Sequence, residues 1–275
     1  MNYTLKRISI FTCVTLSLLI ISCTTTDEST DNAVNFSVED TARAAKADAV
    51  IDGSLNIMEN GIDENVEASR TFPNSLFPEC TQITLTSNGN GGTIVLDFGD
   101  ACELNNGAIV SGIINLEYSP ILSGTRTITY SFENYVYNGN GVAGGGEIFR
   151  QIANANGYPQ STVNESIVVS FPNTPITATR NGLRIAEWVE GVDSGTWLDN
   201  VYHITGNWNT TFTNGFQRTG EVTQTLVRKL NCLFFVSGVL EITQENFTAS
   251  IDYGSGECDN QATITINGQD FPIGL

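Results

Sequence analysis

Residues 128–141, ITYSFENYVYNGNG, decide the fold class of this chain. The first five alternate apolar and polar side chains, and two Asn-Gly pairs follow, at 138–139 and 140–141. Alternation with period two is typical of a β-strand with one buried face. Asn-Gly favours the positive φ angles of type I′ turns. This stretch therefore predicts a strand that ends in a tight hairpin.

The same pattern recurs from Cys80 onward. Further alternating runs lie at 94–98, 167–171 and 247–253, and further Asn-Gly pairs lie at 88–89, 90–91, 106–107, 156–157, 181–182, 214–215 and 267–268. We predict a mainly β fold over residues 75–275, an antiparallel meander of about a dozen strands. Either a sandwich or a curved, barrel-like sheet satisfies this pattern.

Residues 38–70 form the only segment with helical periodicity. Its apolar and small residues fall on one stripe: Val38, Ala42, Ala45, Ala49, Leu55, Ile62 and Val66. Acidic residues lie elsewhere around the helix: Asp48, Asp52, Glu59 and Asp63. Gly53 and Gly61 weaken the pattern, so one helix and two helices separated at Asn60-Gly61 remain alternatives. We expect this short helical segment to pack against the β domain.

Residues 1–22 have the three parts of a secretory signal. Lys6 and Arg7 are basic, residues 8–21 are apolar, and a small residue, Ser22, precedes Cys23. The apolar run is shorter than the ~20 residues needed to cross a bilayer core. Residues 20–23, Ile-Ile-Ser-Cys, resemble the lipobox of bacterial lipoproteins. The resemblance implies cleavage before Cys23, lipid attachment to its thiol, and an acidic polar tether over 23–37.

The composition is acidic but not densely charged. The chain has 30 acidic and 12 basic residues, a formal net charge of −18, and charged residues make up only 15% of it. Such a charge argues against binding nucleic acid through a general electrostatic field. Polar surface supplied mostly by Asn, Thr, Ser and Gly favours a β protein over a disordered acidic chain.

The remaining cysteines predict two disulfides. Cys13 leaves with the signal and Cys23 is the anchor, which leaves an even set in an exported chain: Cys80, Cys102, Cys232 and Cys258. A zinc site is the alternative. The set contains no Cys-x-x-Cys pair, however, and the chain has a single histidine, His203.

A weak internal repeat favours one pairing of these cysteines. Residues 96–99, Leu-Asp-Phe-Gly, precede Cys102, and residues 251–254, Ile-Asp-Tyr-Gly, precede Cys258. In both copies another cysteine lies one hairpin upstream and a further strand follows, at 108–118 and 261–267. The repeat favours Cys80–Cys102 and Cys232–Cys258, within disulfide hairpins at 80–118 and 232–273. Chance similarity between two hairpins is the alternative.

These residues also resemble a group of Bacteroidota lipoproteins that has no assigned activity. The resemblance is carried by Asp97-Phe98-Gly99…Cys102, by Arg184…Trp188…Gly191, and by Asp252-Tyr253-Gly254-Ser255-Gly256-Glu257-Cys258-Asp259-Asn260. The second copy is the fuller match, because the first has Asp100-Ala101 where a more Gly-rich loop is expected. The resemblance implies an outer-membrane lipoprotein held by covalent lipid, facing the cell surface or the periplasm, and it implies no mechanism.

Arg184, Trp188 and Trp197 are the candidate ligand-binding residues. Leu183, Ile185 and Val189 share one strand face, which puts Arg184 and Trp188 on the other. An outward Trp beside an Arg would stack on a sugar ring or anchor a partner. A sheet with both faces buried is the alternative. Trp208, in phase with Ile204 and Phe212, is expected in the core.

A calcium site is the one candidate cofactor site. Asp252, Glu257, Asp259 and Asn260 gather hard oxygen ligands in a Gly-rich loop. The alternative is that these are ordinary turn residues. No other cofactor is expected.

Three hypotheses for the function remain. His203 is expected on a polar strand face, and no nucleophile elbow, zinc-protease motif or phosphate-binding loop occurs. This favours a non-catalytic binding or envelope-interaction module, with a glycan, peptide or envelope protein as partner. A carboxylate-dependent glycoside hydrolase is the second hypothesis, although Glu187 and Glu190 are expected on opposite strand faces. A purely structural envelope component is the third.

Overall fold

The computed structural model describes residues 38–67, 74–87, 89–245 and 247–275. The predicted signal (1–22), the anchor Cys23 and the tether (23–37) lie outside the described residues. All described residues belong to one compact unit, Val34–Leu275. None of the described helices combines the length and the hydropathy that crossing a bilayer requires.

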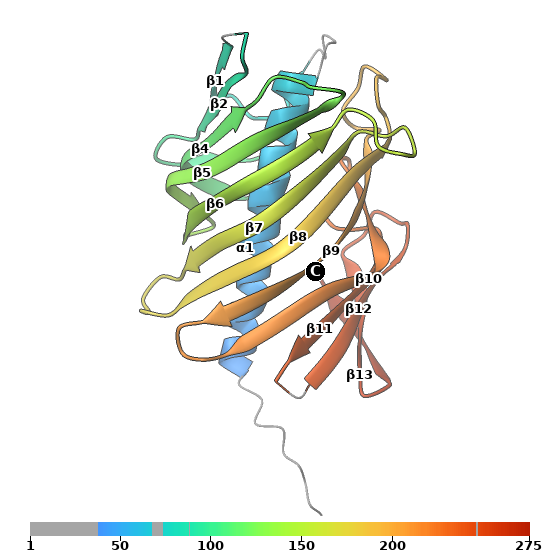
Figure 1. Ribbon diagram of the computed structural model, residues 1–275. Coiled ribbons are helices and arrows are strands. Elements are labelled where there is room, and N and C mark those ends of the chain that lie inside the picture. Colours follow the sequence, from blue (N-terminus) through green and yellow to red (C-terminus); the bar gives the residue numbers. More distant parts are fainter. Residues whose placement is uncertain (1–37, 68–73, 88, 246) are drawn as a thin grey trace, which may run out of the picture. The chain divides into compact units, whose positions relative to one another are not determined.

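A single antiparallel sheet makes up most of the unit. Its strands are β1 (Gln82–Ser87), β2 (Gly92–Asp97), β3 (Cys102–Glu103), β4 (Ile109–Tyr118), β5 (Thr125–Tyr137), β6 (Asn140–Gln151), β7 (Gln160–Ser170), β8 (Thr177–Glu190), β9 (Val201–Phe212), β10 (Gln217–Lys229), β11 (Ser237–Gln244), β12 (Phe247–Ser255), β13 (Gln261–Ile266) and β14 (Gln269–Gly274). Each strand pairs with the next along the chain, except that β2 pairs with β4 and β3 pairs only with β4 (Figure 1). The predicted meander is confirmed. It forms one curved sheet, open between its end strands β1 and β14, and not a sandwich.

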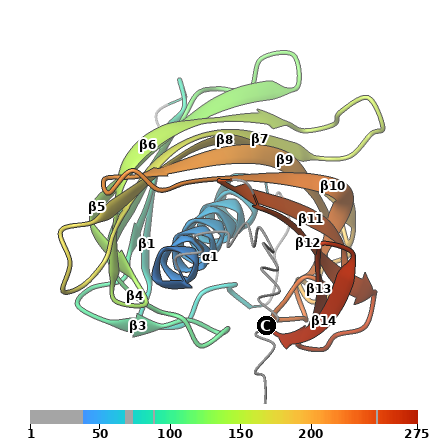
Figure 2. The same cartoon turned by 90° about the horizontal axis from the view of Figure 1, so that it is seen from below.

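One long helix lies inside the curve of this sheet (Figure 2). Helix α1 (Val38–Ile62) runs without a break into a π-helical turn, η1 (Asp63–Glu67). Its buried apolar side chains form one core with inward-facing residues of β2, β4, β5, β6 and β7; on the helix these include Ala47, Ile51, Leu55, Met58 and Ile62. The helix thus takes the place that a second sheet occupies in a sandwich.

Both glycines of the helix lie directly against side chains of the sheet. A Cβ added to Gly53 would stand 2.4 Å from Cζ of Tyr137, and one added to Gly61 would stand 2.9 Å from Cδ1 of Leu96. The absence of a side chain is therefore a packing requirement at both positions. For this reason the chain continues as one helix through residues that weaken helix propensity.

The inward face of β8 is the one that carries its charges. Arg180, Arg184 and Trp188 are buried on the concave face, whereas Leu183 and Ile185 are only half-buried on the convex face. Side chains of β8 therefore alternate between the two faces as predicted, but the set predicted to face outward faces inward. An arginine can face inward here because helix α1 supplies acceptors inside the sheet.

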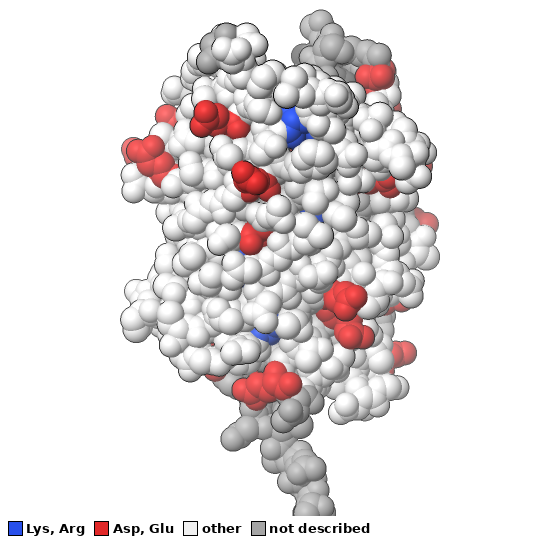
Figure 3. Space-filling model, in the orientation of Figure 1, with Lys and Arg blue, Asp and Glu red and all other residues white. Residues whose placement is uncertain are grey.

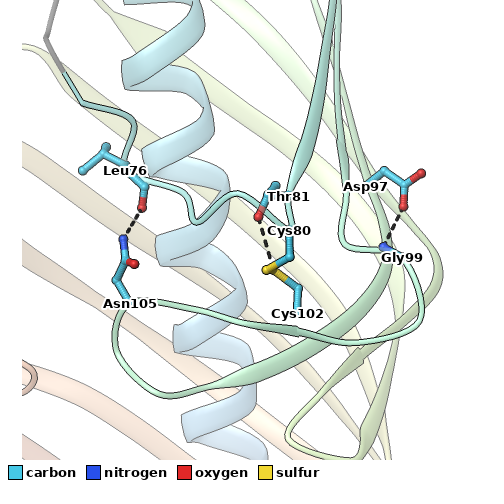
Figure 4. Close-up of a disulfide and its surroundings, with 7 residues drawn as sticks. All are labelled: Leu76, Cys80, Thr81, Asp97, Gly99, Cys102 and Asn105. Atoms are coloured by element: carbon cyan, nitrogen blue, oxygen red, sulfur yellow. Dashed lines mark hydrogen bonds between the residues drawn. A yellow bond between two sulfur atoms is a disulfide. The ribbon is translucent and has the colours of Figure 1, made fainter.

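Both predicted disulfides are present. Cys80–Cys102 and Cys232–Cys258 have Cα–Cα distances of 5.5 and 5.4 Å. Beside the first, Oδ1 of Asp97 accepts a hydrogen bond from the backbone N–H of Gly99 at 2.9 Å (Figure 4). In the second copy Asp252 accepts the same bond from Gly254, also at 2.9 Å. The two repeated hairpins thus share their local turn as well as their sequence.

The convex face is sparsely charged and mostly acidic. Figure 3 shows scattered Asp and Glu side chains on it and very few Lys or Arg. Arginine is instead concentrated inside the sheet, where Arg126, Arg150, Arg180, Arg184 and Arg218 are all buried. The interior, not the surface, therefore holds most of the positive charge of the domain.

Replacing Gly53 by alanine tests the fit between helix and sheet. In an exposed helix this change stabilises by about 0.5–1 kcal/mol. Here we expect a loss of about 1–3 kcal/mol in the free energy of unfolding, because the new methyl group displaces Tyr137. Urea denaturation followed by circular dichroism measures it. The same change in a Tyr137→Leu background is the control and should cost less. A stabilised Gly53→Ala protein would contradict the packing.

Candidate functional site

A polar stripe on helix α1 faces the arginines of the sheet. Asp48, Asp52, Asn56, Glu59 and Asp63 are spaced by three or four residues, which places them on one helical face. Their partners come from β6, β8, β9 and β10 and form three groups along the helix. The predicted packing stripe is wrong over the first turns, where Ala42, Ala45 and Ala49 are exposed. The acidic residues that periodicity placed away from that stripe instead form a buried contact with the sheet.

Arg150 of β6 is at the centre of the first group. Its Nη1 donates to Oε1 of Glu59 and its Nη2 to Oδ1 of Asp63, both at 2.6 Å. Ser161 accepts a further bond from Nη1 at 2.8 Å. Tyr202 donates to Oδ2 of Asp63 at 2.7 Å, and burial raises the pKa of Tyr202 well above its ordinary value, helped by the charge of Asp63. The tyrosine therefore stays protonated and acts as a donor.

Arg180 of β8 is at the centre of the second group. Its Nε and Nη2 donate to the two oxygens of Glu165 at 2.7 and 3.1 Å, and Nη2 also donates to Asp52 at 2.9 Å. Burial alone would lower the pKa of Arg180, but Asp52, Glu165 and Asp48 outweigh it and raise that pKa. Burial likewise raises the pKa of Glu165, and Arg180 offsets part of this effect.

Trp208 and Arg218 complete the second group. Cζ of Arg180 lies 4.2 Å from the centre of the Trp208 ring, a cation–π contact. The indole N–H of Trp208 donates to Oδ1 of Asp48 at 3.1 Å, and Arg218 of β10 lies 3.2 Å from Oδ2 of the same carboxylate. Trp208 is buried, as its phase in the sequence indicated.

The third group contains two arginines and no carboxylate. Nη2 of Arg184 and Nη1 of Arg228 both donate to Oδ1 of Asn56, at 2.8 and 3.0 Å, and Arg228 also donates to Asn60 at 3.3 Å. Neither guanidinium forms an ion pair with any described residue. Nη1 of Arg184 is buried and has no hydrogen-bond partner among the described residues. Burial lowers the pKa of Arg228, and the charge of Arg184 adds to this effect.

A cleft opens over the part of helix α1 that the sheet leaves uncovered. It consists of two cavities of about 580 and 620 Å³ that share Gly53, Asn56, Asn106, Arg228 and Leu233 in their walls. The walls of the larger cavity are mainly apolar on the C-terminal side: Phe234, Phe235, Leu240, Ile242, Ile251 and Tyr253. Volumes of this size are typical of small-molecule sites.

A third, small cavity of about 30 Å³ adjoins the cleft at Asn56. Arg184 and Gly206 are among its lining residues, and Gly206 is paired with Arg184 in the sheet. Gly206 has φ of 141°, and a Cβ there would lie 2.0 Å from the carbonyl oxygen of Leu183. The register of β10 against β9 also shifts nearby, between Glu221 and Leu226. The absence of a side chain at Gly206 therefore allows β9 to lie close to the backbone of β8 beside Arg184.

The structure places two of the three predicted ligand-binding residues, Trp188 and Trp197, in one buried apolar cluster and Arg184 outside that cluster. Arg184 lines the small cavity and Trp197 lines the 580 Å³ cavity, with its indole N–H bonded to the carbonyl oxygen of Asn74 at 2.8 Å. Trp188 is buried, stacked on Tyr202, and bonded to the carbonyl oxygen of Glu190. Trp188 is therefore not an outward-facing platform for a sugar ring. The alternative, a sheet with both faces buried, does not describe β8 either, because only its concave face is buried.

Of the predicted calcium ligands, Asp252 and Asp259 accept backbone hydrogen bonds from Gly254 and Gln261, as turn residues do. No group of three or more His, Cys, Asp or Glu side chains that could hold a metal ion gathers in the described part of the chain. The calcium site stays a prediction. His203 is half-buried on β9. Glu187 accepts hydrogen bonds from Asn154 and Asn156, whereas Glu190 is exposed.

Asn56, Asn60 and Arg228 were not identified from the sequence. Two patterns in the sequence could have indicated them. Arginines stand at strand positions in phase with buried residues, in a chain with few basic residues, and acidic residues are spaced by three or four in the helix. Pairing the two sets needs the fold, because Arg228 and Asn56 are 172 residues apart.

Removing Arg150 tests the buried ion pairs. Arg150→Met leaves Glu59 and Asp63 buried without their counter-ion, so we expect a loss of about 3–5 kcal/mol in the free energy of unfolding. Replacing all three, Arg150→Met with Glu59→Leu and Asp63→Leu, should restore most of this loss. Glu39→Gln, which removes an 84% exposed partner of Arg43, is the control and should cost less than about 1 kcal/mol. A loss that small in Arg150→Met would contradict the buried pair.

Comparison with known proteins finds no match for this chain. No protein-family model, no curated protein and no solved structure matches the chain.

Proposed function

We propose that this protein is an exported, lipid-anchored binding protein that holds an amphipathic small molecule in the cleft between helix α1 and the C-terminal strands. The observation that carries the proposal is the cleft itself, a pair of adjoining cavities with an apolar wall and a polar floor. A wall of aromatic and aliphatic side chains takes up an apolar body through the hydrophobic effect. Asn56, Asn60 and Arg228 on the floor take up polar groups.

Exposed apolar residues at the rim support binding in the cleft. Leu233 is 69% exposed and lines both cavities, and Leu198 is 65% exposed and lines one. Large apolar side chains at the mouth of a concave apolar site are typical of an interaction site. A glycan is a less suitable ligand than an amphiphile, because Trp188 and Trp197 are both buried and present no exposed ring.

The engagement of the interior carboxylates favours binding over hydrolysis. Glu59, Asp63 and Glu165 each accept at least one hydrogen bond from an arginine. A glycoside hydrolase needs one carboxyl group that gives up a proton and a second that acts as base or nucleophile. Carboxylates held by guanidinium groups are poor candidates for either role. The proposal is therefore a non-catalytic one.

The anchoring part of the proposal rests on the lipobox-like residues around Cys23. We expect Cys23→Ser to lose incorporation of a fatty-acid label and to leave the membrane fraction, because the serine hydroxyl does not replace a thiol nucleophile toward the lipid donor. Cys13→Ser, within the apolar part of the signal, is the matched control and should keep both properties. Retention of the label by Cys23→Ser would refute the anchor.

Binding of a neutral apolar dye tests the cleft. N-phenyl-1-naphthylamine gains fluorescence in apolar surroundings, and we expect it to bind the chain from residue 24, which contains the whole compact unit. Leu233→Gln should weaken binding roughly fivefold, the equivalent of about 1 kcal/mol of lost apolar contact.

Leu122→Gln is the matched control for this measurement. Leu122 is 70% exposed, as Leu233 is 69% exposed, but it lines none of the three cavities. Its substitution should leave the affinity for the dye unchanged. Absence of dye binding, or equal effects of the two substitutions, would count against the cleft as the ligand site.

A further inference from the structure

We propose that Arg184, Arg228 and Asn56 bind the carboxylate of a singly charged amphiphile, such as a single-chain fatty acid. This inference rests on the proposed function, since the cleft must first hold the apolar part of that ligand. It names the chemical group that the polar end of the cleft recognises and the residues that recognise it.

The three side chains meet where the cavities adjoin. Asn56 lines both cavities of the cleft and the small cavity, Arg228 lines both cavities of the cleft, and Arg184 lines the small one. Both guanidinium groups donate to the same oxygen of Asn56. A group placed at this junction therefore reaches donors from two strands and one helix.

The partners of these two arginines differ from those of Arg150, Arg180 and Arg218, which each have a carboxylate within 3.2 Å. Arg184 and Arg228 instead share one neutral amide oxygen. Nη1 of the 5% exposed Arg184 has no hydrogen-bond partner among the described residues. Nη1 of Arg180 and Nε of Arg218 also have none, so the difference lies in the missing carboxylate. A buried cationic donor left in this state costs free energy that an incoming anion recovers.

The size of the small cavity favours a carboxylate over a phosphate. Its volume of about 30 Å³ accommodates one or two oxygen-sized atoms, since one water needs about 10–15 Å³ in the same measure. A planar carboxylate also matches the two parallel N–H bonds that a guanidinium offers. The four oxygens of a phosphate need more space than this.

Charges around the site also favour a single negative charge. Asp52 lines the small cavity beside Arg184, although Arg180 holds it at 2.9 Å. A dianion is repelled by this carboxylate more strongly than a monoanion is. Asp52 therefore disfavours a ligand group with two negative charges.

Asn56 provides an isosteric substitution that tests the inference. Asn56→Asp would place a carboxylate from the protein itself between the two guanidinium groups. We expect it to raise the melting temperature and to remove the preference for a carboxylate ligand, while binding of an uncharged amphiphile continues. If Asn56 merely satisfied its neighbours structurally, the ligand preference would not change.

The experiment measures displacement of N-phenyl-1-naphthylamine by dodecanoate, methyl dodecanoate and dodecyl phosphate. For the unsubstituted chain we expect dodecanoate to bind at least roughly tenfold more tightly than the methyl ester, from one or two charge-assisted hydrogen bonds, and more tightly than the phosphate. Arg228→Gln and Asn56→Asp should both remove the difference between acid and ester. Lys229→Gln removes the neighbouring charge of β10 outside the cleft and is the control; it should keep the difference.

The outcomes of this experiment separate the carboxylate site from the proposed function. Equal affinities for dodecanoate and its methyl ester overturn the carboxylate site and leave the proposed function standing. Tighter binding of dodecyl phosphate overturns the assignment to a carboxylate. An acid preference that persists in both Arg228→Gln and Asn56→Asp overturns the assignment to these residues. Absence of displacement by all three probes, with no binding of the dye itself, overturns the proposed function.

Discussion

The contact between the polar stripe of helix α1 and the inward-facing arginines is the interaction on which the rest of the structure depends. Apolar packing alone holds the helix in the curved sheet but leaves its rotation and its position along the axis weakly defined. A shift of one helical turn would break the bonds of Arg150 and Arg180 and leave buried charges unpaired, which is strongly unfavourable. Buried ion pairs add little net stability over apolar contacts. Any other position of the helix along the sheet leaves their charges unpaired, however, and is therefore less stable.

The open form of the sheet follows from the same arrangement. The curved sheet encloses the helix without closing, so one side of α1 is left without strands. Small residues occupy the helix there, Ala45, Ala49 and Gly53, and all three line the 620 Å³ cavity. The cleft is thus a consequence of wrapping one sheet around one helix.

The sequence predicts the fold class, but it does not predict which face of each strand is buried. Alternation, Asn-Gly turns and the repeat around Cys102 and Cys258 sufficed for the meander and its disulfides. Periodicity was misleading on β8, because it assigns arginine to solvent and Leu183 to the core. That assignment fails where a segment 128 residues away supplies an acceptor for Arg184. Of the residues that line the cavities, the sequence predicts only Arg184 and Trp197 as ligand-binding residues. No pattern around Asn56 indicates a binding role.

The acidic stripe changes its chemistry at one position. Asp48 and Asp52 precede Asn56, and Glu59 and Asp63 follow it, so a carboxylate at residue 56 would continue the pattern and give both arginines a charged acceptor. The amide of Asn56 leaves two desolvated guanidinium groups with a neutral acceptor. This arrangement lowers the free energy of unfolding relative to a paired one, so stability alone does not account for it. The position is also the one at which all three cavities meet. The polar contact that fixes the helix therefore lacks a carboxylate at one position, and the proposed ligand supplies one there.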